Sequence, residues 1–188
     1  MAYGESVPRL VLISGATGVG KTTLAKAVAH EMGLARIASS DTIREVMRAT
    51  ANSSNPALNR SSYGRGDVGD AGTDWEDAAR AVEPGIDAVV ERARQQGVDL
   101  VLEGVHVIPS RRLLSAWETA GGAAVGVVIK IEDESTHRER IEQREANTWR
   151  GAERYRIGFE RIRSIQRTIE EKGAGAEWKV VDSRLHQD

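Results

Sequence analysis

The chain has 188 residues, of which 40% are hydrophobic and 29% are charged, and its formal net charge is −2. This length and composition predict a single globular domain over residues 1–188 with a sizeable core. The charge balance argues against a basic surface for nucleic acid, and the absence of cysteine excludes disulfides, thiol nucleophiles and thiolate zinc sites.

No targeting or membrane signal is visible in the sequence. Residues 1–8 have neither the basic region nor the apolar core of a signal peptide, and no apolar run approaches the ~20 residues of a membrane span. We therefore expect a cytoplasmic protein that does not bind membranes. The sequence leaves the oligomeric state open.

Apolar runs alternate with helical patterns along the chain. The runs predicted to be strands are residues 10–13, 35–38, 98–102, 123–131 and 178–181. The first predicted helix carries Leu24, Val28 and Met32 on one face and ends at Gly33 as C-cap, and the second begins at Asp41 as N-cap. Further helices are predicted over residues 75–96 and 111–119. The last helical stretch runs from 134 to about 172, with a break near 150–151. This alternation predicts a three-layer α/β fold, in which a parallel sheet is covered by helices on both faces.

A glycine-rich loop separates the first strand from the first helix. Its residues are Gly15, Ala16, Thr17, Gly18, Val19, Gly20, Lys21, Thr22 and Thr23, and the first eight match G-x-x-x-x-G-K-[ST] at every fixed position. Glycines let successive N–H groups turn toward phosphate oxygens, and the helix start adds the positive end of its dipole. Lys21 would reach the β- and γ-phosphates, and the Thr22 hydroxyl would bind Mg²⁺. The pattern predicts a MgATP site, and the flanking strand and helix disfavour a chance glycine-rich turn.

The other signals favour a small-molecule kinase. A guanine-reading N-K-x-D segment and a transporter L-S-G-G-Q segment are both absent from this small chain. Asp41 and Arg44 follow the second predicted strand, and Glu103 and His106 follow the third, where open parallel sheets bind ligands. Asp41 would orient the attacking hydroxyl or hold a magnesium-bound water, and Arg44 would clamp a phosphate or carboxylate. The alternatives are that Asp41 only caps its helix, that Arg44 is solvated, and that His106 is structural.

Two further segments are interpreted as parts of such a site. Residues 50–73 are rich in Asn, Ser, Gly and Asp and show no periodicity, which is typical of a functional loop. Arginines crowd residues 138–167 among acids, so most are expected in solvated helical pairs. Arg140, Arg144 and Arg150 are candidates for a small helical lid, at about residues 133–155, that closes over the phosphates and excludes water.

The chain resembles the 2-phosphoglycerate kinase family over almost its whole length. The segments that carry the resemblance are residues 15–23, residues 40–48, Ser61-Ser62-Tyr63, residues 102–106 with Pro109, and Tyr155 to Gln166. The phosphate loop alone is generic, whereas Glu-Gly-Val-His and Ser-Ser-Tyr in this order are far more specific.

The resemblance implies ATP- and Mg²⁺-dependent transfer to 2-phosphoglycerate, giving 2,3-bisphosphoglycerate, on a P-loop fold with sheet order 2-3-1-4-5. It implies that residues 50–73 form the acceptor side, where Arg44, Arg60, Ser62 and Tyr63 would hold the anionic substrate. A kinase for another acceptor, such as a natural product, an antibiotic or a nucleoside, remains an alternative. A second alternative is a nucleotide-binding regulator that has no phosphoryl acceptor.

Overall fold

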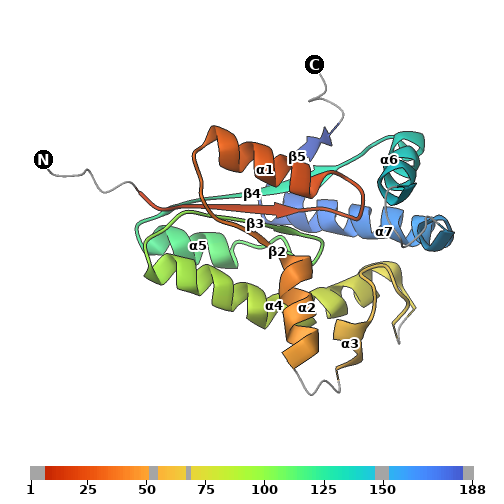
Figure 1. The fold of residues 1–188 in the computed structure, drawn as a ribbon, viewed down its shortest axis with the longest axis horizontal. Coiled ribbons are helices and arrows are strands. Elements are labelled where there is room, and N and C mark those ends of the chain that lie inside the picture. The colour runs from red at the N-terminus through yellow and green to blue at the C-terminus, as the bar shows by residue number, and fades with distance from the viewer. Residues whose placement is uncertain (1–6, 51–54, 67–68, 147–152, 184–188) are drawn as a thin grey trace, which may run out of the picture.

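The computed structural model describes residues 7–50, 55–66, 69–146 and 153–183, and its centre is a parallel sheet of five strands (Figure 1). The strands are β1 (Arg9–Ser14), β2 (Ile37–Ser39), β3 (Leu100–Gly104), β4 (Ala123–Lys130) and β5 (Lys179–Asp182). Their spatial order is β2-β3-β1-β4-β5, so the order implied by the family resemblance is confirmed.

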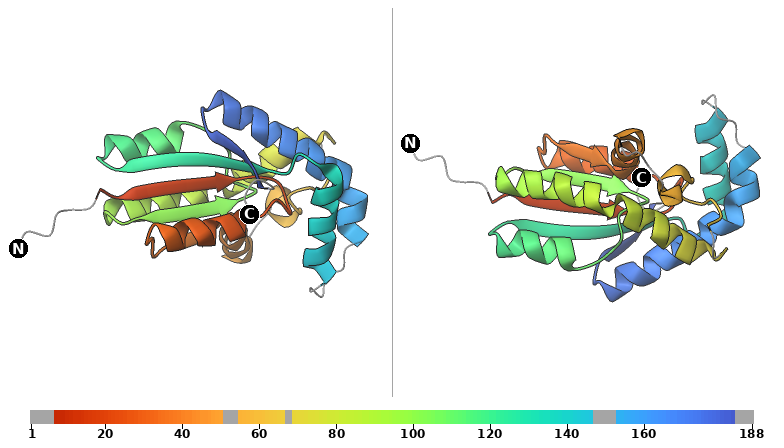
Figure 2. Two further views of the ribbon diagram at one scale, coloured as in Figure 1. Left: turned by 90° about the horizontal axis from the view of Figure 1, so that it is seen from above. Right: turned by 90° about the horizontal axis from the view of Figure 1, so that it is seen from below.

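Helices cover both faces of this sheet (Figures 1 and 2). The helices are α1 (Lys21–Glu31), α2 (Ser40–Thr50), α3 (Pro56–Asn59), α4 (Ala71–Gln95), α5 (Arg112–Thr119), α6 (Glu134–Ala146) and α7 (Glu153–Gly175). Along β1, Leu10 and Leu12 join the core beneath α4, α5 and α7, whereas Val11 and Ile13 join the core beneath α1. The central strand is therefore apolar throughout, as expected for a strand buried on both faces.

The packing of α1 differs from the predicted apolar face. The buried residues of α1 are Ala25 and Ala29, while Leu24 and Val28 are half-buried and Met32 is 41% exposed. Small side chains bring α1 close to the sheet, so the alanines form its contact line. Gly33 has a φ of 64°, and the C-terminal glycine predicted after this helix is confirmed.

The prediction of one long loop over residues 50–73 was wrong in part. Asn55 caps the short helix α3, because its side chain accepts a hydrogen bond from the N–H of Ala57, and Pro56 supplies the first helical residue. Asp70 caps α4 by accepting from the N–H of Thr73, so this helix begins four residues before the predicted start. The second strand likewise covers residues 37–39 rather than 35–38.

The parallel register places the carboxyl ends of three strands at one edge of the sheet. Ser39 lies opposite Glu103, and Ser14 lies opposite Gly104. The loops that leave these strands therefore meet, and the site is found there. The predicted helix break near 150–151 lies outside the described residues. Within the described part of the chain, no helix is both long enough and apolar enough to cross a membrane.

Candidate active site

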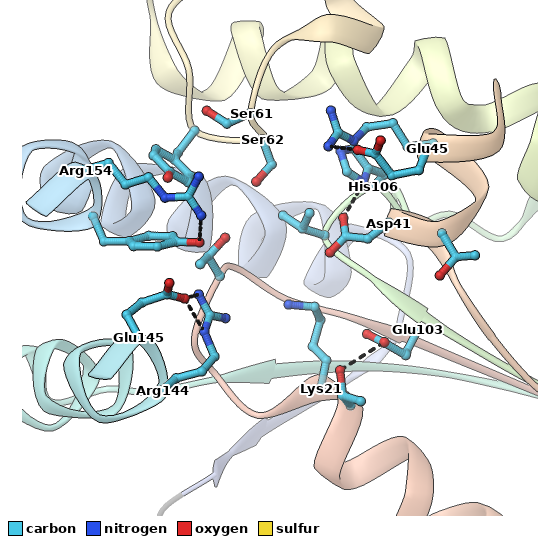
Figure 3. A pocket seen from close by; sticks show the side chains of 17 residues that line it. Lys21, Asp41, Glu45, Ser61, Ser62, Glu103, His106, Arg144, Glu145 and Arg154 are labelled. Carbon is cyan, nitrogen blue, oxygen red and sulfur yellow. Dashed lines mark hydrogen bonds and ion pairs between the residues drawn. The ribbon is translucent and has the colours of Figure 1, made fainter. Parts of the chain in front are cut away.

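A cavity of about 800 Å³ opens at this edge of the sheet, beside the loop between β1 and α1 (Figure 3). The phosphate loop, which we define as residues 15–20, forms one side of it. Gly18 and Gly20 have φ of 86° and 97°, left-handed values that suit glycine. Gly20 is also the N-cap of α1, so the N–H groups of the first turn are ready partners for a phosphate.

Lys21 and Thr22 open α1 at the floor of the cavity. The Lys21 ammonium donates to the carbonyl of Ala16 at 2.7 Å, and the Thr22 hydroxyl donates to Oε1 of Glu103 at 3.0 Å. Burial lowers the pKa of Lys21, and the negative charges of Glu103 and Asp41 limit that decrease. A cation, a hydroxyl and a carboxylate thus lie together at the end of the phosphate loop.

Asp41 lies in the first turn of α2, with its carboxylate directed toward the cavity and Lys21 (Figure 3). Its Oδ1 is 3.4 Å from Nδ1 of His106. A hydrogen bond with His106 lowers the pKa of Asp41 against the opposing effect of burial, and the charges of Lys21 and Arg44 add to the decrease. The carboxylate is therefore ionised at neutral pH, the state in which it accepts a hydrogen bond from a hydroxyl group.

His106 lies beside Asp41, and the His106 side chain is only 1% exposed. The Ser40 hydroxyl lies 3.3 Å from Nδ1 of His106, and it also accepts from the His106 backbone N–H at 3.4 Å. Gly104 makes this close approach possible, because a Cβ there would collide with the Ser40 hydroxyl. Nε2 of His106 has no hydrogen-bond partner among the described residues. The Glu103 to His106 segment thus fixes the position of Asp41.

Residues Ser61, Ser62 and Tyr63 form the wall opposite Lys21. Arg44 holds the segment before them by donating from Nη1 to the carbonyls of Leu58 at 3.0 Å and Arg60 at 2.9 Å. Arg44 also lines the cavity, so it has both a structural role and a position beside a ligand.

Helices α6 and α7 contribute the third side of the cavity. Arg144 pairs with the buried carboxylate of Glu145 at 2.8 Å. Arg154 donates from Nη2 to the Tyr155 hydroxyl at 2.6 Å, and no carboxylate of the described residues pairs with it. Tyr155 also packs against Tyr63 with ring centroids 5.2 Å apart, and burial raises the pKa of Tyr63 to about 12. Arg154, which the sequence analysis missed, is thus a guanidinium facing the cavity without an acidic partner in this part of the chain.

Arg60 and Arg140 are predicted site residues that do not line the cavity. Arg60 turns away from the cavity, and its guanidinium lies beside Gly66. Arg140 is beside Gly20 of the phosphate loop and donates to the Ser183 hydroxyl at 2.7 Å. Arg150 lies outside the described residues. Of the predicted arginines, Arg44 and Arg144 therefore line the cavity, and Arg154 lines it in addition.

A second residue missed from the sequence is His137 of α6, which is completely buried. Its Nε2 lies 2.8 Å from the carbonyl of Thr17, so this nitrogen carries the proton, and Nδ1 lies 3.4 Å from Nη1 of Arg163. Burial lowers the pKa of His137 to about 4, in keeping with a neutral ring. Gly18 packs against Ile141 one turn further along, so α6 rests directly on the phosphate loop. The contact between His137 and Thr17 could not be predicted from the sequence, because it joins residues 120 positions apart.

The donors at this site fit Mg²⁺ that arrives with a nucleotide. The Thr22 hydroxyl and the Glu103 carboxylate are hard oxygen donors beside Lys21, the kind of ligand that Mg²⁺ prefers. Among the residues that the structure describes, no group of three or more His, Cys, Asp or Glu side chains could hold a metal. Magnesium in kinases takes its other ligands from phosphates and water, so one or two protein oxygens suffice.

Comparison with known families places residues 10–171 within a family model described as an AAA domain. Two curated relatives are named 2-phosphoglycerate kinase. The one from Methanopyrus kandleri is 34% identical over 177 residues, covering 84% of this chain and 51% of the relative. The one from Methanothermobacter thermautotrophicus is 33% identical over 177 residues, covering 87% and 56%. The chain thus spans about half the length of the curated relatives it matches.

A solved structure shares the fold. The shikimate kinase from Acinetobacter baumannii, in complex with shikimate, aligns with a TM-score of 0.51 and 15% identity, covering 94% of this chain and 84% of that chain. Similarity at this identity shows the architecture alone.

Proposed function

Because this chain belongs to the AAA domain family and is similar to 2-phosphoglycerate kinases, we propose that it transfers the γ-phosphoryl group of ATP to 2-phosphoglycerate, giving 2,3-bisphosphoglycerate. The observation that supports this most is the cavity itself. It joins the phosphate loop to a wall of guanidinium and hydroxyl groups within one volume, so that a nucleotide and an anionic acceptor would meet there.

The nucleotide would bind at the phosphate loop. Backbone N–H groups of residues 15–20 and the start of α1 would hold the β- and γ-phosphates, and Lys21 would add a mobile positive charge between them. Thr22, supported by Glu103, would hold Mg²⁺. Mg²⁺ held there would neutralise part of the charge of the phosphates. Preorganised donors of this kind stabilise the charge on the transferred group.

The acceptor would lie between Asp41 and the opposite wall. Its hydroxyl would donate a hydrogen bond to the Asp41 carboxylate, which would orient the oxygen toward the γ-phosphorus. Phosphoryl transfer needs little base strength at this position, because the transition state is loose and alignment dominates. A carboxylate whose pKa is lowered therefore suits orientation better than early proton removal. As the new O–P bond forms, the bond between the γ-phosphorus and ADP would break, and the hydroxyl proton would pass to the Asp41 carboxylate and from there to solvent.

The arginines would recognise the charges of the acceptor. 2-Phosphoglycerate carries a phosphate and a carboxylate beside its primary hydroxyl, roughly three negative charges near neutral pH. Arg154 suits bidentate binding of such groups. Arg44 would add positive charge beside the acceptor, because its Nη1 and Nη2 already donate to the Leu58 and Arg60 carbonyls and to Glu45. In this proposal residues 50–73 form the acceptor side and residues 133–155 the lid, with Arg144 over the phosphates.

A panel assay tests the proposal. ADP release with MgATP should be strongly stimulated by 2-phosphoglycerate, and mass spectrometry should find a product with one added phosphate. Lys21→Ala should lower kcat/KM about a hundredfold or more, whereas Lys26→Ala, an exposed lysine of the same helix, should have no effect. If a different acid stimulates ADP release instead, the protein is a kinase that acts on another acceptor. If none of the phosphorylated and carboxylated metabolites stimulates ADP release, the proposal is contradicted.

A further inference from the structure

The residues that line the acceptor side of the cavity belong to a segment with little regular structure. This acceptor segment, residues 55–66, contains only the four-residue helix α3 and the turn that follows it. Its backbone carbonyls are instead bound by two arginines from other elements. Arg44 of α2 binds the first half, and Arg161 of α7 binds the second half.

Arg161 uses all three of its nitrogen atoms for this purpose. Nε donates to the carbonyl of Tyr63 at 3.0 Å, Nη2 to that of Gly64 at 3.2 Å, and Nη1 to that of Gly69 at 2.9 Å. Nη2 also donates to Oδ2 of Asp74 at 2.7 Å. The side chain of Asp74 is 1% exposed and that of Arg161 is 19% exposed, so the guanidinium is locked between a buried carboxylate and the carbonyl oxygens. A planar group with five fixed donors can bridge these acceptors, which a lysine ammonium cannot do.

The same helix holds the Tyr63 side chain. Tyr63 packs on the bare backbone of Gly158, where an added Cβ would lie 2.8 Å from the Tyr63 ring. The ring also contacts Tyr155 one turn earlier. Tyr155, Gly158 and Arg161 thus lie along one face of α7 and hold the side chain and the backbone of Tyr63 together. Arg161 itself does not line the cavity, so it acts only through the residues it holds.

We propose that Arg161 is a positioning residue for the phosphoryl acceptor, because its contacts with the Tyr63, Gly64 and Gly69 carbonyls and with Asp74 set the acceptor wall of the cavity. This inference rests on the proposed function for the identity of the substrate. It goes beyond that function by assigning the position of the acceptor wall to a residue of α7. Its contacts reach neither the phosphate loop nor Lys21. Loss of Arg161 therefore changes acceptor binding and spares nucleotide binding.

Kinetics of three variants test this separation. Arg161→Met keeps the length of the side chain and removes every donor, and Arg161→Lys keeps the charge facing Asp74. Arg156→Met is the matched control, because Arg156 lies on the same helix in exposed ion pairs with Glu142 and Glu153. In Arg161→Met we expect the KM for the acceptor to rise about tenfold or more, with the KM for ATP and acceptor-free ATP hydrolysis within about twofold of wild type. Arg161→Lys should be intermediate, and Arg156→Met should match wild type.

Amide hydrogen exchange supplies a readout that needs no acceptor. The N–H groups of residues 61–66 should exchange faster in both Arg161 variants, while those of the phosphate loop should keep their wild-type rates. Equal increases in both KM values, or unchanged exchange at residues 61–66 in the foldable Arg161→Lys variant, would overturn the positioning role. If wild type responds to no acceptor, the proposed function fails, and the exchange rates still decide whether Arg161 holds the wall.

Discussion

At the residue scale, Lys21, Asp41 and His137 lie around the phosphate loop, and the pKa of each is lowered, for two different reasons. Burial acts on Lys21, a hydrogen bond with His106 acts on Asp41, and burial acts on His137. The consequence is a separation of charge. Asp41 stays negative on the acceptor side, whereas His137 stays neutral behind the loop, where its N–H is needed for the carbonyl of Thr17.

The stability of the protein should depend on His137 in mildly acidic solution. Its pKa is about 4 in the folded state and about 6.5 in the unfolded state. Between these values the unfolded chain binds the proton more readily, so stability is complete above pH ~6.5 and falls as the pH falls toward ~4. The loss attributable to this residue is roughly 3 kcal/mol, with no further contribution below pH ~4.

Urea unfolding of wild type and His137→Gln between pH 7 and 4 would measure this contribution. The glutamine amide can still donate to the carbonyl of Thr17 but does not titrate in this range. The variant should therefore lose less stability than wild type on acidification. Equal losses in the two proteins would show that His137 is not the responsible group.

At the element scale, α6 and α7 each hold one part of the cavity. Helix α6 packs on the phosphate loop through His137 and Ile141, and α7 packs on the acceptor segment through Tyr155, Gly158 and Arg161. Helix α6 and the N-terminal part of α7 lie together beyond the end of the sheet (Figure 2). A shift of these two helices relative to the sheet would therefore move both the phosphate loop and the acceptor segment.

Gly18→Ala should disturb the contact between α6 and the phosphate loop. The new methyl group would collide with Ile141, and the φ of 86° is unfavourable for alanine. Gly33→Ala is the matched control, because its φ is 64° and nothing lies within 4 Å of the added Cβ. Gly33→Ala should lose about 1 kcal/mol in urea unfolding from backbone strain. Gly18→Ala should lose more because of the added collision, and only Gly18→Ala should raise the KM for ATP. An unchanged KM in Gly18→Ala would show that the loop tolerates displacement from α6.

Local sequence patterns predicted the elements better than the contacts between them. The phosphate loop, the strands and the end of α1 at Gly33 follow from glycine positions and apolar runs, which are local properties of the chain. The start of α4 was also readable, because Asp70 and Thr73 form a capping pair. Arg161 could not be separated from the other arginines of α7, because its role depends on Tyr63 and Asp74, about ninety residues away. Side-chain partners that distant are set by the tertiary fold.

At the scale of the whole molecule, charged side chains of both signs gather in the cavity although the chain is nearly neutral. Asp41 and Glu103 lie near Lys21. Arg44 and Arg144 line the cavity in ion pairs with Glu45 and Glu145, and Arg154 lines it without a carboxylate partner among the described residues. A cavity lined by both signs of charge would suit a metal–nucleotide complex together with an anionic acceptor.

Binding of MgATP should stabilise the whole domain if the proposed site is correct. At a concentration one hundred times the Kd, a ligand adds about 2.7 kcal/mol, which raises the Tm of a domain of this size by roughly 5–10 °C. Thermal unfolding with ATP, with and without Mg²⁺, would measure the shift. Lys21→Ala should keep its Tm without ligand and lose most of the increase. A full shift in that variant would argue that the nucleotide binds elsewhere.

The two edges of the central sheet are formed by its shortest strands, β2 with three residues and β5 with four. An edge strand offers its outward N–H and C=O groups as a template on which another chain can add a strand, and the risk of aggregation grows with its length. The longer strands β1, β3 and β4 lie inside the sheet, where each has a neighbouring strand on both sides. The strand order that builds the cavity therefore also keeps the longest strands away from the edges, where self-association would begin at high concentration.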